Sequence, residues 1–469
     1  MMFLFNYTKL FVWSTIYYFQ KEESTILTEI IIKNIRECGC IAIKFCQWIL
    51  PQIEILYDYD IRQDPLLKRF ESLYEDCDHH SLEHTEKAYL NDFKSQLKDD
   101  FIIHEVVASG SIGQVYKVTS KLDNKVYALK SIHPLINYQI TFWKYLIQSL
   151  YYIPIIRYYI KTIIPIDLNG FIDDFRTQTD LINESNNCSF FNTIYEDNHL
   201  LIIPEVYQVS KNILIMSYEE GDKMDSLEIS DYIKYKIAML IKLFIRTNEQ
   251  VYYRTHGDLH RGNWKVRMVD GKPRLVIYDF GFCWKVPDNL KGNIEKITDA
   301  FLCMSDETLD DVVEGCYLFT NKICSREVIY ESIHEVRKKY DYNDTKFIVR
   351  LIMNATKKQS TLIEPYVIQS LVVQSQVLRI LEKYSLIRYQ TSDYEPKYMI
   401  NEYYNRRLPE LINLCKTENV FMEYSNQLEE TYIKKNIQID EIFKYSYLEN
   451  DIDQYPELED MAIEGINFS

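Results

Sequence analysis

Residues 256–263 read His-Gly-Asp-Leu-His-Arg-Gly-Asn, and residues 279–281 read Asp-Phe-Gly after an apolar, strand-like run. Asp258 and Asn263 are five positions apart, so one short ordered loop can aim both side chains into one site. Mg²⁺ prefers hard oxygen ligands, typically one or two carboxylates together with phosphate oxygens. The stretch therefore predicts a protein-kinase-like phosphate site. Asp258 would orient the attacking hydroxyl or water, while Asn263 and Asp279 would hold the metal.

A phosphate-binding cation is expected upstream of this stretch. Lys130 ends the strand-like run Val-Tyr-Ala-Leu-Lys, from which an ammonium can reach the α- and β-phosphates of a nucleotide. Such a lysine needs an acidic partner on a helix to orient it, and Glu184 lies in a helical stretch farther along the chain. Lys130 and Glu184 therefore join Asp258 as candidate catalytic residues.

Residues 108–115 read Ala-Ser-Gly-Ser-Ile-Gly-Gln-Val and lie between two strand-like runs. Small residues let backbone amides approach phosphate oxygens, so this segment is a candidate phosphate-binding loop. Residues 213–221 resemble a hinge between two lobes, whose backbone would contact adenine. The candidate nucleotide-binding residues are Ala108, Ser109, Gly110, Ser111, Ile112, Gly113, Val115, Lys130, Met216 and Tyr218.

Together these pieces resemble the UbiB-like family of atypical kinases, also described as aarF-domain-containing kinases. The resemblance runs from about Cys38 to about Asp311. Residues 43–47, Ile-Lys-Phe-Cys-Gln, resemble the family's Lys-x-Gly-Gln signature in a helical N-terminal extension. Residues 109–115 resemble its alanine-rich loop. Residues 180–191 resemble its helix with a glutamate and, downstream, an asparagine and a phenylalanine.

The resemblance implies a kinase-like fold whose extension packs over the usual protein-substrate cleft. It also implies that the chain binds ATP, or ADP, with Mg²⁺ and supports isoprenoid-quinone or other lipid metabolism. ATPase activity is better supported for the family than phosphorylation of proteins. The residues that the resemblance marks as regulatory are Lys44, Gln47, Gln178 and Asp180.

The chain departs from the family pattern at four positions. Cys46 replaces the glycine of the extension signature, and Gln178 replaces a carboxylate that would face Lys44. These two changes predict that the inhibitory contact of the extension is altered. Gly110 stands where the loop usually has alanine, which predicts an altered nucleotide preference. Arg261 replaces a typical proline.

A chain of 469 residues is too long for one compact core and suits two lobes with extensions. We expect an α+β, bilobal protein-kinase-like fold with a helical N-terminal extension. The expected domains are a helical extension with a Lys-x-x-Gln motif at 1–100, a kinase-like N-lobe with a family insert at 101–221, a helical C-lobe at 222–400 and an acidic C-terminal segment at 401–469.

Hydrophobic periodicity and β-rich runs place the expected elements. They are helices over 22–98, a small antiparallel sheet over 101–130, a helix over 171–196, a strand pair at 202–206 and 213–218, and mostly helix from 222 to about 386. The segment from about residue 420 is rich in Asp and Glu with little periodicity, which predicts loose order.

Two aromatic stretches leave alternatives open. Residues 1–19 are marginal in length for a spanning helix, and they lack a signal-peptide cleavage site and the Arg- and Ser-rich character of a transit peptide. They fit a helix packed on the body of the protein or one lying on a membrane surface. Residues 142–166 fit a buried helical pair or, because basic residues accompany the aromatics, a membrane-facing surface. A lipid or membrane surface is therefore an alternative partner beside the nucleotide.

Charge and cysteine content restrict the remaining classes. The formal net charge is −16, and an acidic chain repels phosphate backbones, which argues against a general nucleic-acid binder. Of the ten cysteines, Cys38, Cys40 and Cys46 lie closest together, but no second pair follows at zinc-ligand spacing. Free thiols in a reducing, intracellular compartment are expected, with peripheral membrane association as an alternative.

Three functions remain open at this point. The first is a UbiB-like ATPase or small-molecule kinase. The second is a phosphotransferase like the aminoglycoside and choline kinases, because residues 256–260 also resemble the catalytic loop of those kinases. The extension motif at 44–47 argues against this second function. The third is a nucleotide-gated scaffold without catalysis, although all the core residues are present.

Overall fold

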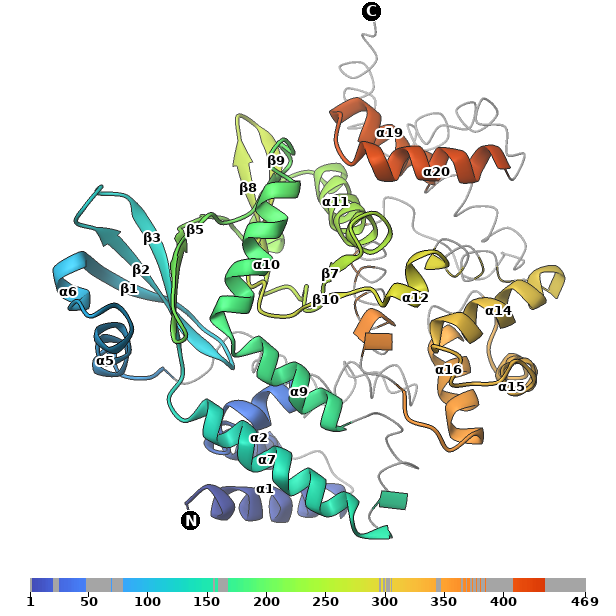
Figure 1. Cartoon of the computed structure of the whole chain (residues 1–469), viewed down its shortest axis with the longest axis horizontal. Coiled ribbons are helices and arrows are strands. Elements are labelled where there is room, and N and C mark those ends of the chain that lie inside the picture. Colours follow the sequence, from blue (N-terminus) through green and yellow to red (C-terminus); the bar gives the residue numbers. More distant parts are fainter. Residues whose placement is uncertain are drawn as a thin grey trace, which may run out of the picture.

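The computed structural model describes residues 2–19, 25–47, 79–154, 168–294, 306–342, 347–363 and 408–434, together with isolated positions between these ranges. The expected features at Trp48 and the rest of 48–68, and the acidic tail beyond 434, lie outside the described residues. The α+β fold class is confirmed: an antiparallel sheet and a larger helical part lie side by side, with further helices at the N-terminus (Figure 1).

A five-stranded antiparallel sheet forms the first half of the molecule. Its strand order is β1-β2-β3-β6-β5. The strands are β1 (Phe101–Ser109), β2 (Gly113–Ser120), β3 (Val126–Ile132), β5 (Val206–Val209) and β6 (Ile213–Ser217). The antiparallel sheet expected over 101–130 is thereby confirmed. Two short helices, α5 (Leu82–Phe93) and α6 (Leu97–Asp100), pack their buried Tyr89 and Leu97 against one face of this sheet.

The opposite face of the sheet packs on helices α7 (Ile136–Tyr151), α9 (Leu168–Gln178) and α10 (Leu181–Ile194). The single helix expected over 171–196 is wrong, because the chain breaks it into α9 and α10. Asp180 makes the break: its carboxylate accepts hydrogen bonds from the backbone amides of Ile182 and Asn183. An aspartate at this position satisfies donors that a helix start leaves unpaired.

Residues 202–206 do not form one strand as expected. β4 (Leu201–Ile202) pairs in parallel with β9, whereas β5 begins at Val206 and pairs with β6. Pro204 lies between them, and its missing amide hydrogen cannot serve a sheet ladder. The chain therefore changes sheets here, which ties the antiparallel sheet to the second half of the molecule.

The second half is built on α11 (Asp231–Gln250), a helix whose apolar side chains are almost all buried. The strand-like run before Asp279 is confirmed as β9 (Lys272–Ile277). The expectation of mostly helix after residue 222 missed three further strands, β7 (Arg254–His256), β8 (Trp264–Val269) and β10 (Cys283–Lys285). The helices beyond them are α12 (Asp288–Lys291), α14 (Leu309–Phe319), α15 (Arg326–Arg337) and α16 (Phe347–Lys358), with 3-10 turns at Met224–Ser226 and Asp306–Thr308.

The segment 408–434 is more regular than its composition predicts. Helices α19 (Leu408–Glu418) and α20 (Met422–Lys434) pack on α11, and buried Leu411, Cys415 and Tyr424 belong to the same core. The expected loose order is therefore wrong for 420–434. Apolar residues three and four apart bury one face of each helix, even though the opposite faces are charged.

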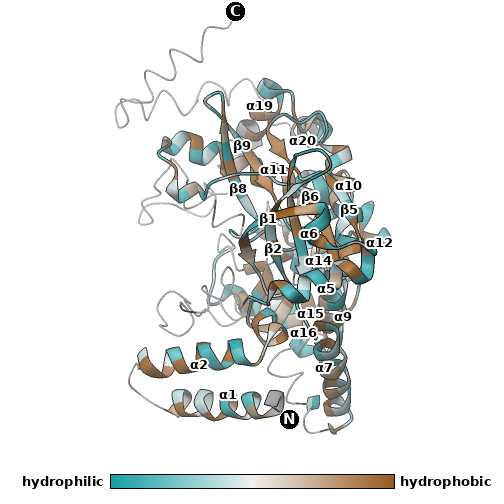
Figure 2. Cartoon of the chain, turned by 90° about the vertical axis from the view of Figure 1, so that its left-hand side faces the viewer, coloured by the Kyte–Doolittle hydropathy of each residue, from teal (hydrophilic) through white to brown (hydrophobic). Residues whose placement is uncertain are grey.

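The N-terminal helices form a separate layer. Helix α1 (Met2–Phe19) lies along α2 (Thr25–Glu37), and Figure 2 shows this pair beside the rest of the molecule. A further helical stretch covers residues 40–47. None of the helices in the described ranges is long and apolar enough to span a membrane.

The aromatic stretches at the N-terminus and in α7 are only partly buried. Tyr7 of α1 packs edge-on against Trp143 of α7, which joins the two helices. Of the stretch 142–166, the part in α7 is mostly half-buried with Tyr145 exposed, and residues 155–156 and 159–167 lie outside the described residues. The large exposed side chains on α1 and on α7 and the turn after it are Phe5, Phe11, Val12, Ile16, Phe19, Tyr138, Tyr145, Tyr152 and Ile153.

None of the cysteines in the described ranges forms a disulfide. Four of those in the core of the second half and of α10 are fully buried, namely Cys188, Cys316, Cys324 and Cys415. They pack there as small apolar side chains.

Candidate functional site

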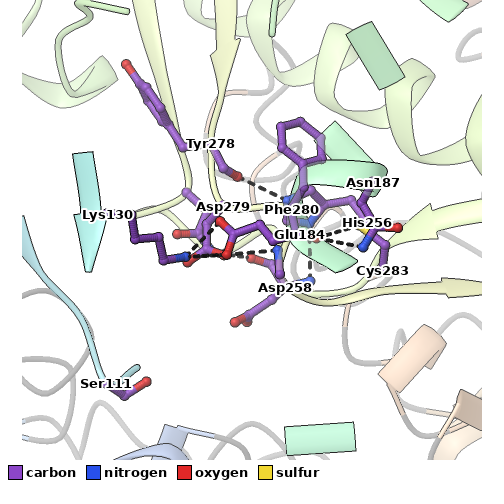
Figure 3. Close-up of polar contacts among 12 residues, drawn as sticks. Ser111, Lys130, Glu184, Asn187, His256, Asp258, Tyr278, Asp279, Phe280 and Cys283 are labelled. Carbon is purple, nitrogen blue, oxygen red and sulfur yellow. Dashed lines mark hydrogen bonds and ion pairs between the residues drawn. The ribbon is translucent and has the colours of Figure 1, made fainter. Parts of the chain in front are cut away.

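A buried ammonium lies at the centre of the site. Lys130 Nζ donates to both carboxylate oxygens of Glu184 at 2.7 and 2.8 Å and lies 3.3 Å from Asp279 Oδ1 (Figure 3). The Lys130 and Glu184 side chains are only 6% and 2% exposed. The structure thus brings together three residues that are far apart in the sequence.

Local structure explains how Lys130 and Glu184 meet. Lys130 is on β3, opposite Val115 of β2 and Leu214 of β6, so its strand is fixed from both sides. Glu184 lies in the first turn of α10, which the Asp180 cap starts at this place. Burial lowers the pKa of Lys130, but the carboxylates of Asp279 and Glu184 more than offset burial and hold this pKa above its usual value.

Asp279 is held in an unusual conformation. Its φ is +52°, in the left-handed region that side chains other than glycine seldom adopt. The carboxylate accepts from the backbone amide of Gly281 at 3.2 Å. Burial raises the pKa of Asp279, but Lys130, Lys44 and the Gly281 amide outweigh burial and lower this pKa to about 2. The carboxylate is therefore charged, and its side chain is still 39% exposed.

Phe280 anchors this turn in the protein core. Its ring lies 5.3 Å from the ring of Phe191 on α10 and 5.3 Å from that of His256. Asn187 donates from Nδ2 to the Phe280 carbonyl at 2.9 Å. Because α10 also carries Glu184, the helix that orients Lys130 and the turn that carries Asp279 are packed as one unit.

The loop after β7 carries Asp258 and Asn263. The buried His256 links this loop to the neighbouring turn: its Nε2 faces the Tyr278 carbonyl at 3.2 Å and its Nδ1 accepts from the Asp258 amide at 3.3 Å. Because the carbonyl can only accept, the proton of the neutral ring is on Nε2. Burial lowers the pKa of His256, which favours this neutral form. Asn263 Nδ2 donates to the Asp258 carbonyl at 2.7 Å.

The N-terminal extension reaches the site in two places. Lys44 Nζ donates to Asp258 Oδ2 at 2.6 Å, and Ser111 Oγ of the glycine-containing loop donates to Gln47 Oε1 at 3.3 Å. Burial raises the pKa of Asp258, but Lys44 and then His260 outweigh burial and lower it below its usual value. The partner of Lys44 is thus Asp258, whereas Gln178 is buried beside Gly281.

The remaining nucleotide-binding candidates lie on β1, β2 and β6, in the loop between β1 and β2, and just after β6. Ala108 and Ser109 end β1, Gly113 and Val115 begin β2, and Gly110, Ser111 and Ile112 connect them. Met216 is opposite Ala128 in the sheet, and the ring of Tyr218 lies 4.5 Å below Lys117 Nζ. These residues thus lie on or next to the sheet whose central strand carries Lys130, whereas Asp180 caps a helix.

The oxygen chemistry of the site fits Mg²⁺. The charged, partly exposed carboxylate of Asp279 is a hard ligand, and Asn263 can offer Oδ1 because its Nδ2 is engaged with the Asp258 carbonyl. These two residues would hold the ion. Among the described residues, no group of three or more His, Cys, Asp or Glu side chains could hold a metal ion.

Sequence reasoning missed three residues that shape the site. Tyr278, immediately before Asp279, donates from its hydroxyl to the Glu219 carbonyl in the hinge-like segment at 2.8 Å. Gln369 donates from Nε2 to the Gly257 carbonyl at 2.6 Å, although it lies 112 residues away. Asn187 fell within a noted motif without a role. The place of Asn187 in the 180–191 motif and the adjacency of Tyr278 to Asp279 were sequence signals, whereas nothing in the sequence indicated the Gln369 contact.

Comparison with known proteins identifies a family and several proteins to which this chain is similar. A family model described as "ABC1 atypical kinase-like domain" matches residues 72–311, more than half of the chain. The chain is 30% identical over 252 residues to "Probable serine/threonine-protein kinase abkC" of Dictyostelium discoideum, covering 52% of this chain and 35% of that protein.

Two further similarities were found. The chain is 27% identical over 196 residues to "Protein ACTIVITY OF BC1 COMPLEX KINASE 3, chloroplastic" of Arabidopsis thaliana, covering 40% of this chain and 27% of that protein. The chain therefore matches about a third or less of the length of these curated relatives. A solved complex of Rv3197 with erythromycin from Mycobacterium tuberculosis is 20% identical with a TM-score of 0.39, covering 62% of this chain and 82% of that one.

The buried ion pair leads to a stability prediction. Glu184→Met should lower the free energy of unfolding by about 3–5 kcal/mol, because it leaves Lys130 buried without its main partner. The double variant Lys130→Met/Glu184→Met should lose clearly less, since it buries no unpaired charge. Urea unfolding at pH 7 measures both values.

An exposed pair is the matched control for this test. Glu83 and Lys87, each 70% exposed, form an i,i+4 ion pair on α5. Glu83→Met should leave the urea midpoint unchanged, because exposed pairs contribute little. If the double variant at Lys130 and Glu184 is less stable than Glu184→Met alone, the buried-charge explanation is wrong.

Proposed function

The chain belongs to the ABC1 atypical kinase-like family, as its motifs indicated, and on this premise we propose that it is an ATP- and Mg²⁺-dependent ATPase or kinase. The observation that carries the proposal is the grouping of Lys130, Glu184 and Asp279 within direct contact. Asp258 shares its loop with Asn263 and is tied to the Asp279 turn through His256. Each part that phosphoryl transfer needs is thus present in one place.

The proposed mechanism assigns one task to each side chain. Lys130 binds the α- and β-phosphate oxygens of ATP, and Glu184 keeps the ammonium in place. Asn263 and Asp279 hold Mg²⁺, which when bound offsets negative charge on the phosphates. Asp258 accepts a hydrogen bond from the attacking water or hydroxyl and orients it in line with the γ-phosphate. Because the groups are fixed before ATP arrives, most of the rate gain comes from positioning and charge.

We propose further that Lys44 restrains this reaction. Its ammonium occupies the carboxylate of Asp258 that would otherwise accept a hydrogen bond from the nucleophile. Gln47, on the same helical stretch, contacts Ser111 of the phosphate-binding loop. The extension thus touches both sides of the site, although Cys46 and Gln178 depart from the family pattern. Release of Lys44 would free Asp258 for its role.

A lipid substrate or surface is supported by the exposed aromatic side chains on α1 and α7. Phe11 and Phe19 of α1 are 74% and 75% exposed, and Tyr138 and Tyr145 lie seven residues apart on the outer face of α7. Aromatic rings of this kind favour the interface between water and lipid. The proposed link to isoprenoid-quinone or other lipid metabolism rests on this surface together with the family resemblance.

Two alternative functions are distinguished by the same assays. Rapid phosphate transfer to an amino-sugar or to choline would favour a small-molecule phosphotransferase. Thermal stabilisation by ATP without turnover, with or without lipid or quinone precursors, would favour a nucleotide-gated scaffold.

Replacing the metal-binding carboxylate tests the main proposal. Asp279→Asn keeps the shape of the side chain but removes its charge, so Mg²⁺-dependent ATP turnover should fall by roughly 100-fold or more. Stabilisation by Mg²⁺ and ATP in a thermal-shift assay should fall in parallel. Asp288→Asn is the control, since that carboxylate is 94% exposed and pairs with Lys291 on its own helix. Unchanged binding and turnover in Asp279→Asn would contradict the proposal.

Removing the restraining ammonium tests the role of Lys44. Lys44→Met should raise kcat about tenfold, because a positioned carboxylate contributes on the order of 100-fold or more to such reactions. The pKa of Asp258 should rise without Lys44, because burial is then less opposed. Activity that needs the ionised carboxylate is lost as the pH falls through this pKa, so the acid limb of the kcat profile should move to higher pH. Lys33→Met, at an exposed position of α2, is the control. An unchanged kcat with an unmoved acid limb would refute the restraint.

Replacing exposed aromatics tests the lipid surface. Phe11→Ser/Phe19→Ser should weaken co-sedimentation with phosphatidylcholine vesicles containing anionic lipid by roughly tenfold or more, because two apolar rings no longer enter the interface. Leu122→Ser is the control, since Leu122 is 84% exposed on the distant β2–β3 turn. Equal loss in both variants, or no binding by the unaltered protein, would rule out this surface.

A further inference from the structure

A chain of hydrogen bonds connects the start of α5 with the loop between β1 and β2. His80 Nδ1 lies 2.8 Å from His133 Nδ1, and His133 Nε2 lies 2.9 Å from the carbonyl of Gly110. His80 precedes α5, whereas His133 directly follows β3. No step of the proposed reaction uses either imidazole.

The Gly110 carbonyl at one end of this series determines which atom donates in every hydrogen bond of the series. The Gly110 carbonyl can only accept, so His133 donates from Nε2 and, as a neutral ring, accepts at Nδ1. His80 must then donate from Nδ1, because two donors or two acceptors cannot share one hydrogen bond. Its Nε2, 2.8 Å from Thr85 Oγ1, accepts from that hydroxyl.

The other end of the chain is determined in the same way. Thr85 uses its proton on His80, so Tyr116 donates from its hydroxyl to Thr85 Oγ1 at 3.1 Å. Gln114 Nε2 donates to the Tyr116 oxygen at 2.6 Å, and Gln114 Oε1 accepts from the His80 amide at 3.0 Å. The series begins and ends on residues around the same loop. Because each donor and acceptor in it is determined, each imidazole has a single tautomer.

His133 holds two carbonyls of the loop on one side. Its ring contacts the Gly110 carbonyl, and its backbone amide donates to the Ile112 carbonyl at 2.9 Å. In a trans peptide, the C=O of one residue and the N–H of the next point in opposite directions. The amides of Ser111 and Gly113 are therefore turned away from His133. Amides presented in this way form the type of concave surface that binds phosphate oxygens.

We propose that the neutral His80–His133 pair is a positioning device that holds the loop 110–113 in its phosphate-binding conformation. The proposal rests on the function proposed above in so far as the ligand is the phosphate chain of ATP. The two histidines act through the loop backbone and do not touch the nucleotide. The same pair makes the loop responsive to acid, because protonating both rings places two donors face to face.

The charge surrounding His80 sets the pH range of this response. The titratable groups facing it are His79 and His84 at the start of α5, Tyr116 of β2 and His133 after β3. Burial, followed by His133, His84 and His79, lowers the pKa of His80 to about 4. A histidine free of the fold titrates near pH 6.5. The ordered loop should therefore be fully favoured above about pH 6.5 and lose stability as the pH falls toward 4.

Two substitutions at His133 distinguish a role in holding the Gly110 carbonyl from a role in packing alone. His133→Gln places an amide N–H near the position of Nε2, within reach of the Gly110 carbonyl, whereas His133→Asn is too short. His104→Asn is the control, because His104 bonds to Thr119 on the exposed face of the same sheet. Kinetics with Mg²⁺ and ATP should show the KM for ATP about tenfold higher in His133→Asn, near the unaltered value in His133→Gln, and kcat within about twofold in both.

A second measurement needs no nucleotide. Hydrogen exchange of the Gly110 amide, which donates to the Gly113 carbonyl across the loop at 3.0 Å, should lose about tenfold protection in the ligand-free chain in His133→Asn and in His80→Leu at pH 7. Protection in the unaltered protein should decrease between pH 7 and pH 5, and His80→Leu should remove this pH dependence. His80→Leu serves as the test variant if His133→Asn does not fold.

The outcomes separate this inference from the proposed function. Equal effects of His133→Asn and His133→Gln, or a fall in kcat with an unchanged KM, would overturn the positioning role. Unaltered amide protection in both test variants would overturn it as well. If the unaltered chain does not bind Mg²⁺ and ATP but the exchange pattern holds, the His80–His133 pair stands and the proposed function fails.

Discussion

One buried ammonium constrains the arrangement of the whole site. Lys130 is removed from water, and a buried charge is tolerated only when opposite charges and hydrogen bonds compensate it. Glu184 and Asp279 supply this compensation from two different parts of the chain. The ion pair therefore fixes the sheet, α10 and the turn after β9 relative to one another. Any change in the position of α10 would leave Lys130 without the carboxylate that accepts both of its short hydrogen bonds.

The sequence alone was sufficient to locate site residues whose role in phosphoryl transfer imposes a recognisable spacing. Lys130, Glu184, Asp258 and Asp279 were identified from the order of short motifs, and the structure brings all four into one site. The family resemblance, on which the α+β expectation rested, is confirmed by the match over residues 72–311. The four side chains can be located in this way because a catalytic loop and a strand-end carboxylate impose local sequence patterns that survive in one chain, while their catalytic and metal-binding roles stay predictions.

The failures have a different physical origin. The motif that marked Asp180 as regulatory did not reveal that its carboxylate caps α10 and so positions Glu184 one turn later. The order of 420–434 was missed because composition hides the burial of one helix face, as Leu428 and Tyr424 illustrate. The Gln369 contact to Gly257 joins residues 112 apart, and no spacing rule connects them. In each case the tertiary partner decides the outcome, and a local pattern does not contain it.

The N-terminal region contacts the loop 110–113 from two separate segments. Gln47 reaches Ser111 from the helical stretch 40–47, whereas His80 acts on Gly110 through His133. Lys44 lies one helical turn before Gln47 and occupies Asp258. A displacement of the stretch 40–47 would thus change the loop and Asp258 together, because one rigid turn carries both side chains. The His80 contact would remain, since it reaches the loop from a different segment. The movement that frees Asp258 would therefore remove the Gln47 contact from Ser111 but leave Gly110 held by His133.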